Sequence, residues 1–195
     1  MDIVRLHEQA MDETARLVGG VRADQMGFPT PCSDWDVRAL IAHLVGGNVR
    51  YAGVAEGTPV RRGPEGTPTG RGAVADDLLG DDPESAYRRS AEVAEQAWRD
   101  PALLDRQFEL PFGTLPGRAA LGMHLVETVT HAWDLAKATG QQPSFDPQVV
   151  QTASQFARSS MPDQRPPGYP FDAPASVADD ATELDHLAAF LGRKL

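Results

Sequence analysis

The chain has 195 residues, of which 41% are apolar, so it is long enough to bury one hydrophobic core. Its formal net charge of −10 argues against binding to nucleic acid or to an anionic membrane surface, because both require a basic patch. The single cysteine excludes an internal disulfide, and neither a signal peptide nor a run of roughly 20 apolar residues is present, so we expect a cytoplasmic protein.

Helical periodicity and capping residues predict six helices in chain order. Ser33 with Asp36 resembles a capping box at the start of the second helix, and Asp-Pro pairs at 82–83 and 146–147 begin the third and fifth. The third helix has a face of small residues at Ala86, Ser90, Val93 and Ala97. The expected helices span residues 2–19, 33–51, 83–99, 121–140, 147–160 and 182–191.

The segments between the helices are expected to be irregular. Residues 57–72 form a glycine-rich loop, residues 73–79 a short helical turn and residues 161–176 a proline-rich segment, while residues 107–115 allow a short hairpin at most. The long connection between the second and third helices can cross a bundle, so these two helices can run parallel. We therefore expect a single all-α domain over residues 1–195, built as a four-helix bundle with short extra C-terminal helices.

The helix predicted over residues 121–140 carries a polar stripe at His124, Glu127, His131 and Asp134 beside its apolar face. Glu127 and His131 are four residues apart, so they lie on the same face, one turn apart, and can bind one metal ion. His43 lies on the flank of the apolar face of the second helix, where it can face a groove between packed helices. His43, Glu127 and His131 would give three ligands and an open position, which is the pattern of a reactive zinc site.

Other residues near this stripe have alternative interpretations. His124 is a rival ligand, which we interpret instead as lining the pocket or supporting the ligands. Asp134 can accept the proton on the second ring nitrogen of His131, or it is a surface acid near the helix end. Cys32 is a ligand, a redox thiol or a small buried apolar residue, and the last is the simplest interpretation.

The tryptophans and the loop arginines are less specific signals. Trp35, Trp98 and Trp133 are most simply core residues or walls of a pocket. An anionic substrate could be received by arginines of the glycine-rich loop, although solvated loop charges are the default; these are Arg61, Arg62 and Arg71.

Two runs of sequence carry a family resemblance. Residues 30–44 (TPCSDWDVRALIAHL) and 127–135 (ETVTHAWDL) resemble actinobacterial metal-binding proteins of the DinB-like superfamily, above all the metal-binding domain of mycothiol-dependent maleylpyruvate isomerase. The C-terminal run LAAFLGR, residues 187–193, fits the same group. The resemblance implies an up-down-down-up bundle with His43, Glu127 and His131 as metal ligands. Many superfamily members have His in place of Glu127, so the mixed set favours the isomerase-like branch.

The resemblance also implies a reaction. A divalent metal, with zinc as first choice and nickel or iron(II) as alternatives, would hold a low-molecular-weight thiol such as mycothiol as the thiolate. The protein would then be a thiol-dependent transferase or isomerase for a small electrophile, with the metal-bound thiol or water as the reactive group and His124 and Asp134 in support. The alternatives are a metal-binding stress or sensor module without turnover, and a metal-dependent hydrolase. A homodimer is left open.

Overall fold

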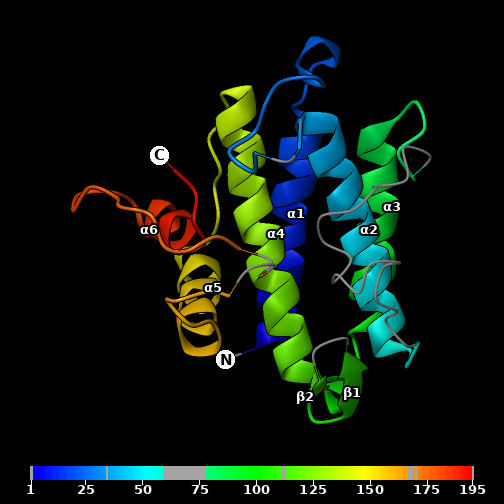
Figure 1. Cartoon of the computed structure of the whole chain (residues 1–195). Coiled ribbons are helices and arrows are strands. Elements are labelled where there is room, and N and C mark those ends of the chain that lie inside the picture. The colour runs from blue at the N-terminus through cyan, green and yellow to red at the C-terminus, as the bar shows by residue number, and fades with distance from the viewer. Residues whose placement is uncertain are drawn as a thin grey trace.

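The computed structural model describes residues 2–33, 35–58, 78–110, 113–166, 169 and 171–194, and it is helical, as the sequence predicts (Figure 1). Two 3-10 turns, η1 (Ala23–Gln25) and η3 (Pro101–Leu104), and an antiparallel hairpin of β1 (Gln107–Leu110) and β2 (Gly113–Pro116) connect the helices. The α-helices are α1 (Ile3–Gly19), α2 (Val37–Ala55), α3 (Pro83–Ala97), α4 (Gly117–Thr139), α5 (Pro147–Ser160) and α6 (Glu183–Phe190).

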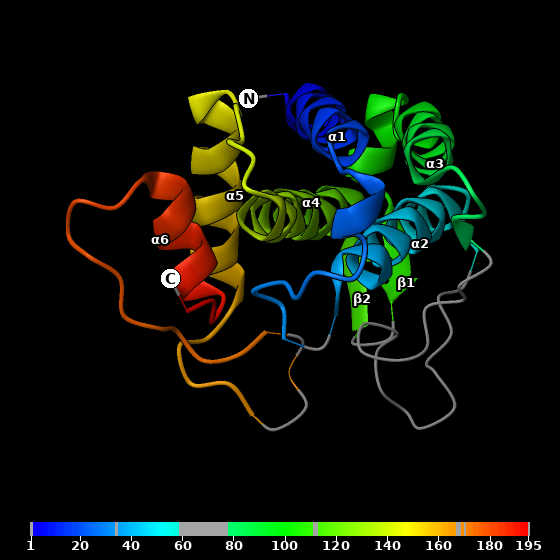
Figure 2. The ribbon, with the colours of Figure 1, turned by 90° about the horizontal axis from the view of Figure 1, so that it is seen from above.

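The first four helices form the expected bundle. α1 packs against α3 and α4, and α2 packs against the same two helices, so α1 and α2 occupy opposite corners of the bundle (Figure 2). In Figure 1, α1 and α4 run upward while α2 and α3 run downward, which is the predicted up-down-down-up order. Most of the connection between α2 and α3 lies outside the described residues, and with it most of the loop expected at 57–72 and of the turn expected at 73–79.

Acidic side chains determine where several helices begin. Asp2 caps α1, Asp82 caps α3 and Asp146 caps α5, each by accepting backbone N–H groups that have no partner inside the helix. Proline follows the cap of α3 and of α5, as predicted, because its missing N–H is not needed in the first turn. The boundaries of these three helices therefore agree with the sequence prediction to within two residues.

The predicted start of the second helix is wrong by one turn. α2 begins at Val37, and its cap is Asp36, whose carboxylate accepts the N–H of Ala39 at 2.8 Å. Ser33 lies outside the helix because the preceding segment is held by other bonds: Asp36 pairs with Pro29 in an isolated β-bridge. The segment between that bridge and the bundle then folds over α2 and α4 as a loop.

The predicted small-residue face of the third helix is partly wrong. Val93 is 51% exposed, whereas Tyr87 is fully buried and Ala91 and Ala94 lie beside it in the core. Tyr87, Ala91 and Ala94 follow the helical spacing i, i+4, i+7, so they define the inner face and turn Val93 toward the outside. Ala86 and Ser90 are buried as expected.

α4 is the central helix of the molecule, and it is buried on nearly every side. Its residues take part in all three hydrophobic clusters: Ala132 and Leu135 pack with α1, α2 and α3, Val129 packs with α5 and α6, and Leu121 packs near the hairpin. Gly140 ends the helix in the left-handed conformation with φ 71°, as its sequence position predicts. Polar residues on α4 must therefore find their partners inside the protein.

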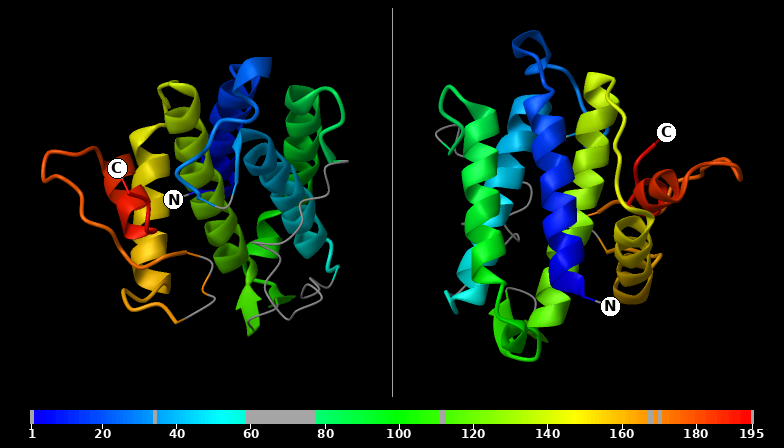
Figure 3. Two further views of the ribbon diagram at one scale, coloured as in Figure 1. Left: turned by 45° about the horizontal axis from the view of Figure 1, so that its top comes forward. Right: turned by 180° about the vertical axis from the view of Figure 1, so that it is seen from behind.

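α5 and α6 cover the side of α4 that faces away from α2 and α3 (Figures 2 and 3). In the two views of Figure 3 the chain's last described residues lie beside α6, and the β1–β2 hairpin lies at the start of α4. Within the described ranges, each helix is too short or too polar to cross a membrane.

Candidate metal centre

His43 belongs to α2, and its side chain lies against the loop that precedes this helix. Its ring stacks on Trp35, with centroids 4.2 Å apart and 29° between the planes, and it is 7% exposed. Burial lowers the pKa of His43 well below its usual value, and the neighbouring His131 and Arg50 add to this shift. His43 is therefore a neutral imidazole, which is the form that binds a metal ion.

His131 of α4 meets His43 where α2 and α4 pack against each other. The ring centroids are 4.9 Å apart and the rings are nearly perpendicular, at 80°. Trp35 also contacts His131, at 5.5 Å between centroids, so one indole covers both imidazoles. The structure thus brings together the two histidines that the sequence analysis proposed, and it places Trp35 as a wall beside them.

The second ring nitrogen of His131 is occupied by Asp134, as the sequence suggested. Nδ1 of His131 lies 3.0 Å from Oδ2 of Asp134, and both side chains are buried. Burial alone would raise the pKa of Asp134, but the hydrogen bond from His131 and the charge of Arg193 outweigh it and hold the pKa below its usual value. An ionised Asp134 accepts the Nδ1 proton, which leaves Nε2 of His131 with a free lone pair.

Glu127 lies one turn before His131 on α4 and is partly buried. Burial raises the pKa of its carboxyl group, while the positive charge of Arg50 on α2 and the neighbouring His131 pull it down. Its charge also acts on the buried Tyr51 of α2. Glu127 is therefore on the side of α4 that faces α2, although its convergence with the two histidines on one ion stays a prediction.

A different trio has its ligand atoms within 4.8 Å of one another: Cys32, His131 and Asp134. Cys32 is partly exposed, so the interpretation as a small buried apolar residue is wrong. The turn that carries it is fixed by Thr30, whose hydroxyl donates to the carbonyl oxygens of Cys32 and Trp35 at 3.0 Å and 2.8 Å. This turn brings Cys32 beside His131 and Asp134, where a ligand role, one of the alternatives left open for it, becomes possible.

His124 lies two turns before His131 on the polar stripe of α4, and its partners are on α1 and α2. Its Nδ1 lies 2.9 Å from Nε2 of His7 on α1, and its ring stacks on Tyr51 of α2, with centroids 4.3 Å apart and 10° between the planes. Burial lowers the pKa of His7 to about 3 and lowers that of His124 as well. Both rings are neutral, and one of them donates its N–H proton to the other. This hydrogen bond favours the interpretation of His124 as a supporting residue. Sequence reasoning missed His7 because nothing near it in the chain indicates a polar partner.

Arg50 of α2 is a charged residue near the site that was not identified from the sequence. Arg50 acts electrostatically on His43, His124 and Glu127, whereas the arginines expected to receive an anion, Arg61, Arg62 and Arg71, lie outside the described residues. Trp98 and Trp133 are core residues, as predicted.

A cavity of about 670 Å³ lies on another side of α4, between its C-terminal half, α5 and the start of α6. Its walls include Trp133, Lys137, Ser154 and Asp185. A pocket beside His43 and His131 was expected instead. The walls of this cavity include neither histidine, so it is separate from the candidate metal centre.

Comparison with known proteins places the chain among relatives of similar length. Residues 7–136 match the family described as the mycothiol maleylpyruvate isomerase N-terminal domain. Two uncharacterized proteins of Mycobacterium tuberculosis, MT0763 of strain CDC 1551 and Rv0738 of strain H37Rv, are each 38% identical over 194 residues, covering 99% of this chain and 98% of theirs.

One solved structure shares the fold. It is the crystal structure of a histidine-to-alanine mutant of the mycothiol-dependent maleylpyruvate isomerase, with a TM-score of 0.58 and 17% sequence identity. The match covers 77% of this chain and 66% of the isomerase chain, so this chain spans just under two thirds of that enzyme.

Proposed function

Because the chain belongs to the mycothiol maleylpyruvate isomerase N-terminal domain family, we propose that it binds a divalent metal ion and uses a low-molecular-weight thiol to transform a small electrophile. The ligands in this proposal are His43, Glu127 and His131, the ion is zinc and the thiol is mycothiol or a similar compound. The reaction is a thiol transfer or an isomerisation.

The observation that carries the proposal is the meeting of two buried histidines from different helices. His43 and His131 lie with ring centroids 4.9 Å apart, and Asp134 occupies Nδ1 of His131. Since Asp134 accepts the Nδ1 proton of His131, Nε2 of His131 and the ring of His43 are the groups that one ion between the two helices could bind. Carboxylate and imidazole together suit zinc among the common divalent metals.

The residue types suit such an ion, and each would have a role there. His43 and His131 offer neutral nitrogens, and Glu127 adds a negative charge that offsets part of the charge of a dication. Bound there, a divalent cation would stabilise a thiolate at neutral pH. Trp35 shields the two imidazoles from water, and Arg50 supplies a positive charge for an anionic group on either substrate.

The experiment that tests the proposal begins with protein purified without chelator and without nickel-affinity chromatography. We expect about one equivalent of divalent metal per chain by elemental analysis. His131→Ala should lose the metal and the thiol-transfer rate together, measured with mycothiol and a chromogenic electrophile that releases chloride on attack by a thiol.

His186→Ala is the matched control, because His186 lies on α6 and makes none of the ring contacts described above. It should retain both metal and activity. Metal-free wild-type protein that still catalyses thiol transfer would contradict the proposed role of the ion. Metal binding without any thiol-dependent turnover would favour a binding module, and turnover without added thiol would favour a hydrolase.

A further inference from the structure

The carboxylate of Asp134 is fully buried and is contacted from two directions. One contact is the hydrogen bond with Nδ1 of His131 described above. The other comes from Arg193: its Nε donates to Oδ1 at 2.9 Å and its Nη2 donates to Oδ2 at 2.9 Å. A buried charge that loses its only counter-charge destabilises a protein strongly, so Arg193 is what permits an ionised carboxylate at this depth.

The guanidinium of Arg193 is itself held firmly, and it is 5% exposed. α6 ends at Phe190, and Gly192 then adopts the left-handed conformation with φ 84°, which redirects the chain so that Arg193 points back toward α4. A β-carbon on Gly192 would lie 2.5 Å from Cβ of Asp172, so the turn also requires the space that glycine leaves. Phe171 lies under the guanidinium, with 5.8 Å between its ring centroid and Cζ.

We propose that Arg193 is a positioning residue of the metal centre: it fixes Asp134, and through Asp134 it fixes the ring of His131. The inference rests on the metal site of the proposed function. Because both carboxylate oxygens are engaged by the planar guanidinium, Asp134 can rotate neither toward the ion nor away from His131. The ligand geometry on α4 therefore depends on a residue near the end of the chain.

The test is metal affinity, measured by competition between the protein and a chromophoric zinc chelator. Arg193→Met keeps much of the side-chain length but removes the charge and the donors, and we expect zinc to bind roughly 10- to 100-fold more weakly, as for other outer partners of metal ligands. Arg193→Lys restores the charge without the two-pronged contact, so its affinity should fall between those of Arg193→Met and the wild type. If Arg193→Met does not fold, this lysine variant decides: affinity equal to the wild type would overturn the proposal.

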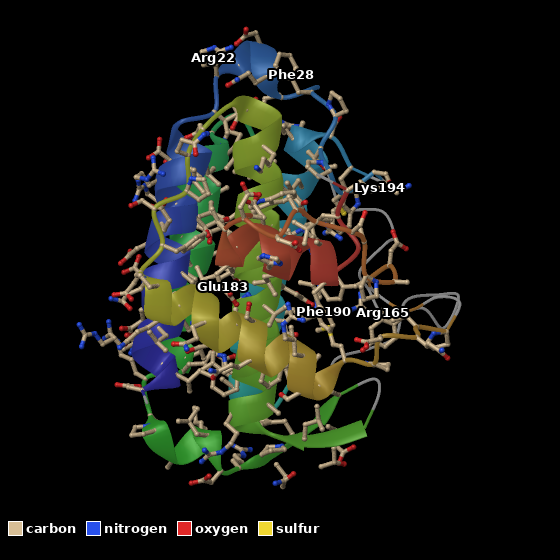
Figure 4. The ribbon with its side chains drawn as sticks, turned by 90° about the vertical axis from the view of Figure 1, so that its left-hand side faces the viewer. Arg22, Phe28, Arg165, Glu183, Phe190 and Lys194 are labelled. Carbon is tan, nitrogen blue, oxygen red and sulfur yellow. The ribbon has the colours of Figure 1, made fainter. Side chains whose placement is uncertain are left out.

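The matched control is Arg165→Met. Arg165 also tethers the end of α6, since its Nη2 donates to the carbonyl oxygen of Phe190 at 2.7 Å and its guanidinium lies 4.9 Å from the ring centroid of Phe190 (Figure 4). Within the described part of the chain, its guanidinium donates to the carbonyl oxygens of Pro162, Asp172 and Phe190 and not to Asp134. We expect Arg165→Met to lower the melting temperature while leaving the zinc dissociation constant unchanged.

A double-mutant cycle separates positioning from general stability. Arg193→Met and Asp134→Asn should each weaken zinc binding, and the double variant should weaken it little further, because both changes break the same connection to His131. Equal losses of affinity in Arg193→Met and Arg165→Met would overturn the proposal, and so would full affinity in a folded Arg193→Met. A wild-type protein that binds no divalent metal would overturn the metal centre itself together with this inference.

Discussion

At the scale of single residues, the hydrogen bonds of Asp134 bear on whether it can itself act as a metal ligand in the proposed centre. Its two oxygens already accept hydrogen bonds from His131 and Arg193 in a buried setting. A carboxylate in this position would have to break those bonds to reach an ion, and buried groups lose much when they lose a partner. In the proposed centre, Asp134 would therefore be the partner of the ligand His131, and Cys32 a neighbour of the site.

The role of Cys32 leads to a prediction. Cys32→Ala should retain the metal and the thiol-transfer rate of the wild type within about twofold, because the attacking sulfur in the proposed reaction belongs to the cosubstrate. Elemental analysis and the chromogenic assay measure the two quantities on the same sample. Loss of metal from Cys32→Ala would show instead that the trio of Cys32, His131 and Asp134 binds the ion.

At the scale of elements, the junction between the hairpin and α4 depends on Gly117. A β-carbon at this position would collide with the backbone carbonyl oxygen of Leu103 in η3. The backbone N–H of Gly117 donates to the carbonyl oxygen of Arg106 at 2.8 Å. A backbone carbonyl cannot rotate away as a side chain can, so η3 or the start of α4 would have to move. Gly117→Ala should lower the free energy of unfolding by about 1–3 kcal/mol, measured by urea denaturation.

Gly46 in α2 is the control for this prediction. A β-carbon there would meet Cδ1 of Leu78 at 3.6 Å, which is ordinary contact. Gly46→Ala should therefore show mainly the higher helix propensity of alanine and raise the free energy of unfolding by up to about 1 kcal/mol. A stabilising effect of both substitutions would show that η3 yields to Gly117→Ala without cost.

Helix α6 shows what could and could not be predicted at this scale. Its sequence predicts a helix over residues 182–191, and the structure has α6 at Glu183–Phe190 with Thr182 as its cap. Two of its contacts with α4 could not be predicted: Asp185 accepts from Nε1 of Trp133 at 2.8 Å, and Arg193 binds Asp134. Helical spacing relates residues of one helix, whereas these pairs join segments whose relative placement depends on the packing of the whole core.

Helical spacing also explains which residues of the candidate site could be predicted from the sequence. Glu127, His131 and Asp134 share one helix, so their relation follows from 3.6 residues per turn. His43 was placed beside them through a family resemblance and not by spacing. Trp35 and Cys32 reach the site through an irregular turn held by Thr30 and a β-bridge, and no periodic pattern reveals such a turn.

At the scale of the whole molecule, the net charge of −10 includes a concentration of acids on α1 and α3. Glu95 is partly buried there, and burial together with Asp12 and Glu8 raises its pKa from 4.5 to about 7. Between pH 4.5 and about 7 the folded protein therefore keeps a proton on Glu95 that the unfolded chain has already released. The free energy of unfolding should therefore decrease as the pH rises from about 4.5 to about 7, and Glu95 should cause no further decrease above that range.

Glu95→Gln tests this dependence. The variant should melt at a higher temperature than the wild type at pH 8, and the difference should shrink toward zero near pH 4, where Glu95 is protonated in both states. Glu56→Gln removes the same charge from the exposed end of α2 and serves as the control. A melting-temperature difference between Glu95→Gln and the wild type that does not change with pH would contradict the raised pKa.

The fold as a whole should not depend on the metal ion. The bundle buries three hydrophobic clusters around α4, and the candidate ligands His43 and His131 lie where α2 and α4 meet instead of replacing a core. Small zinc domains unfold without metal because they have too little else to bury, which is not the case here. A chelator should therefore remove the ion while helical circular dichroism changes little, and the melting temperature should rise with zinc concentration as expected for a ligand that binds only the folded state. Complete unfolding on chelation would instead identify the site as structural.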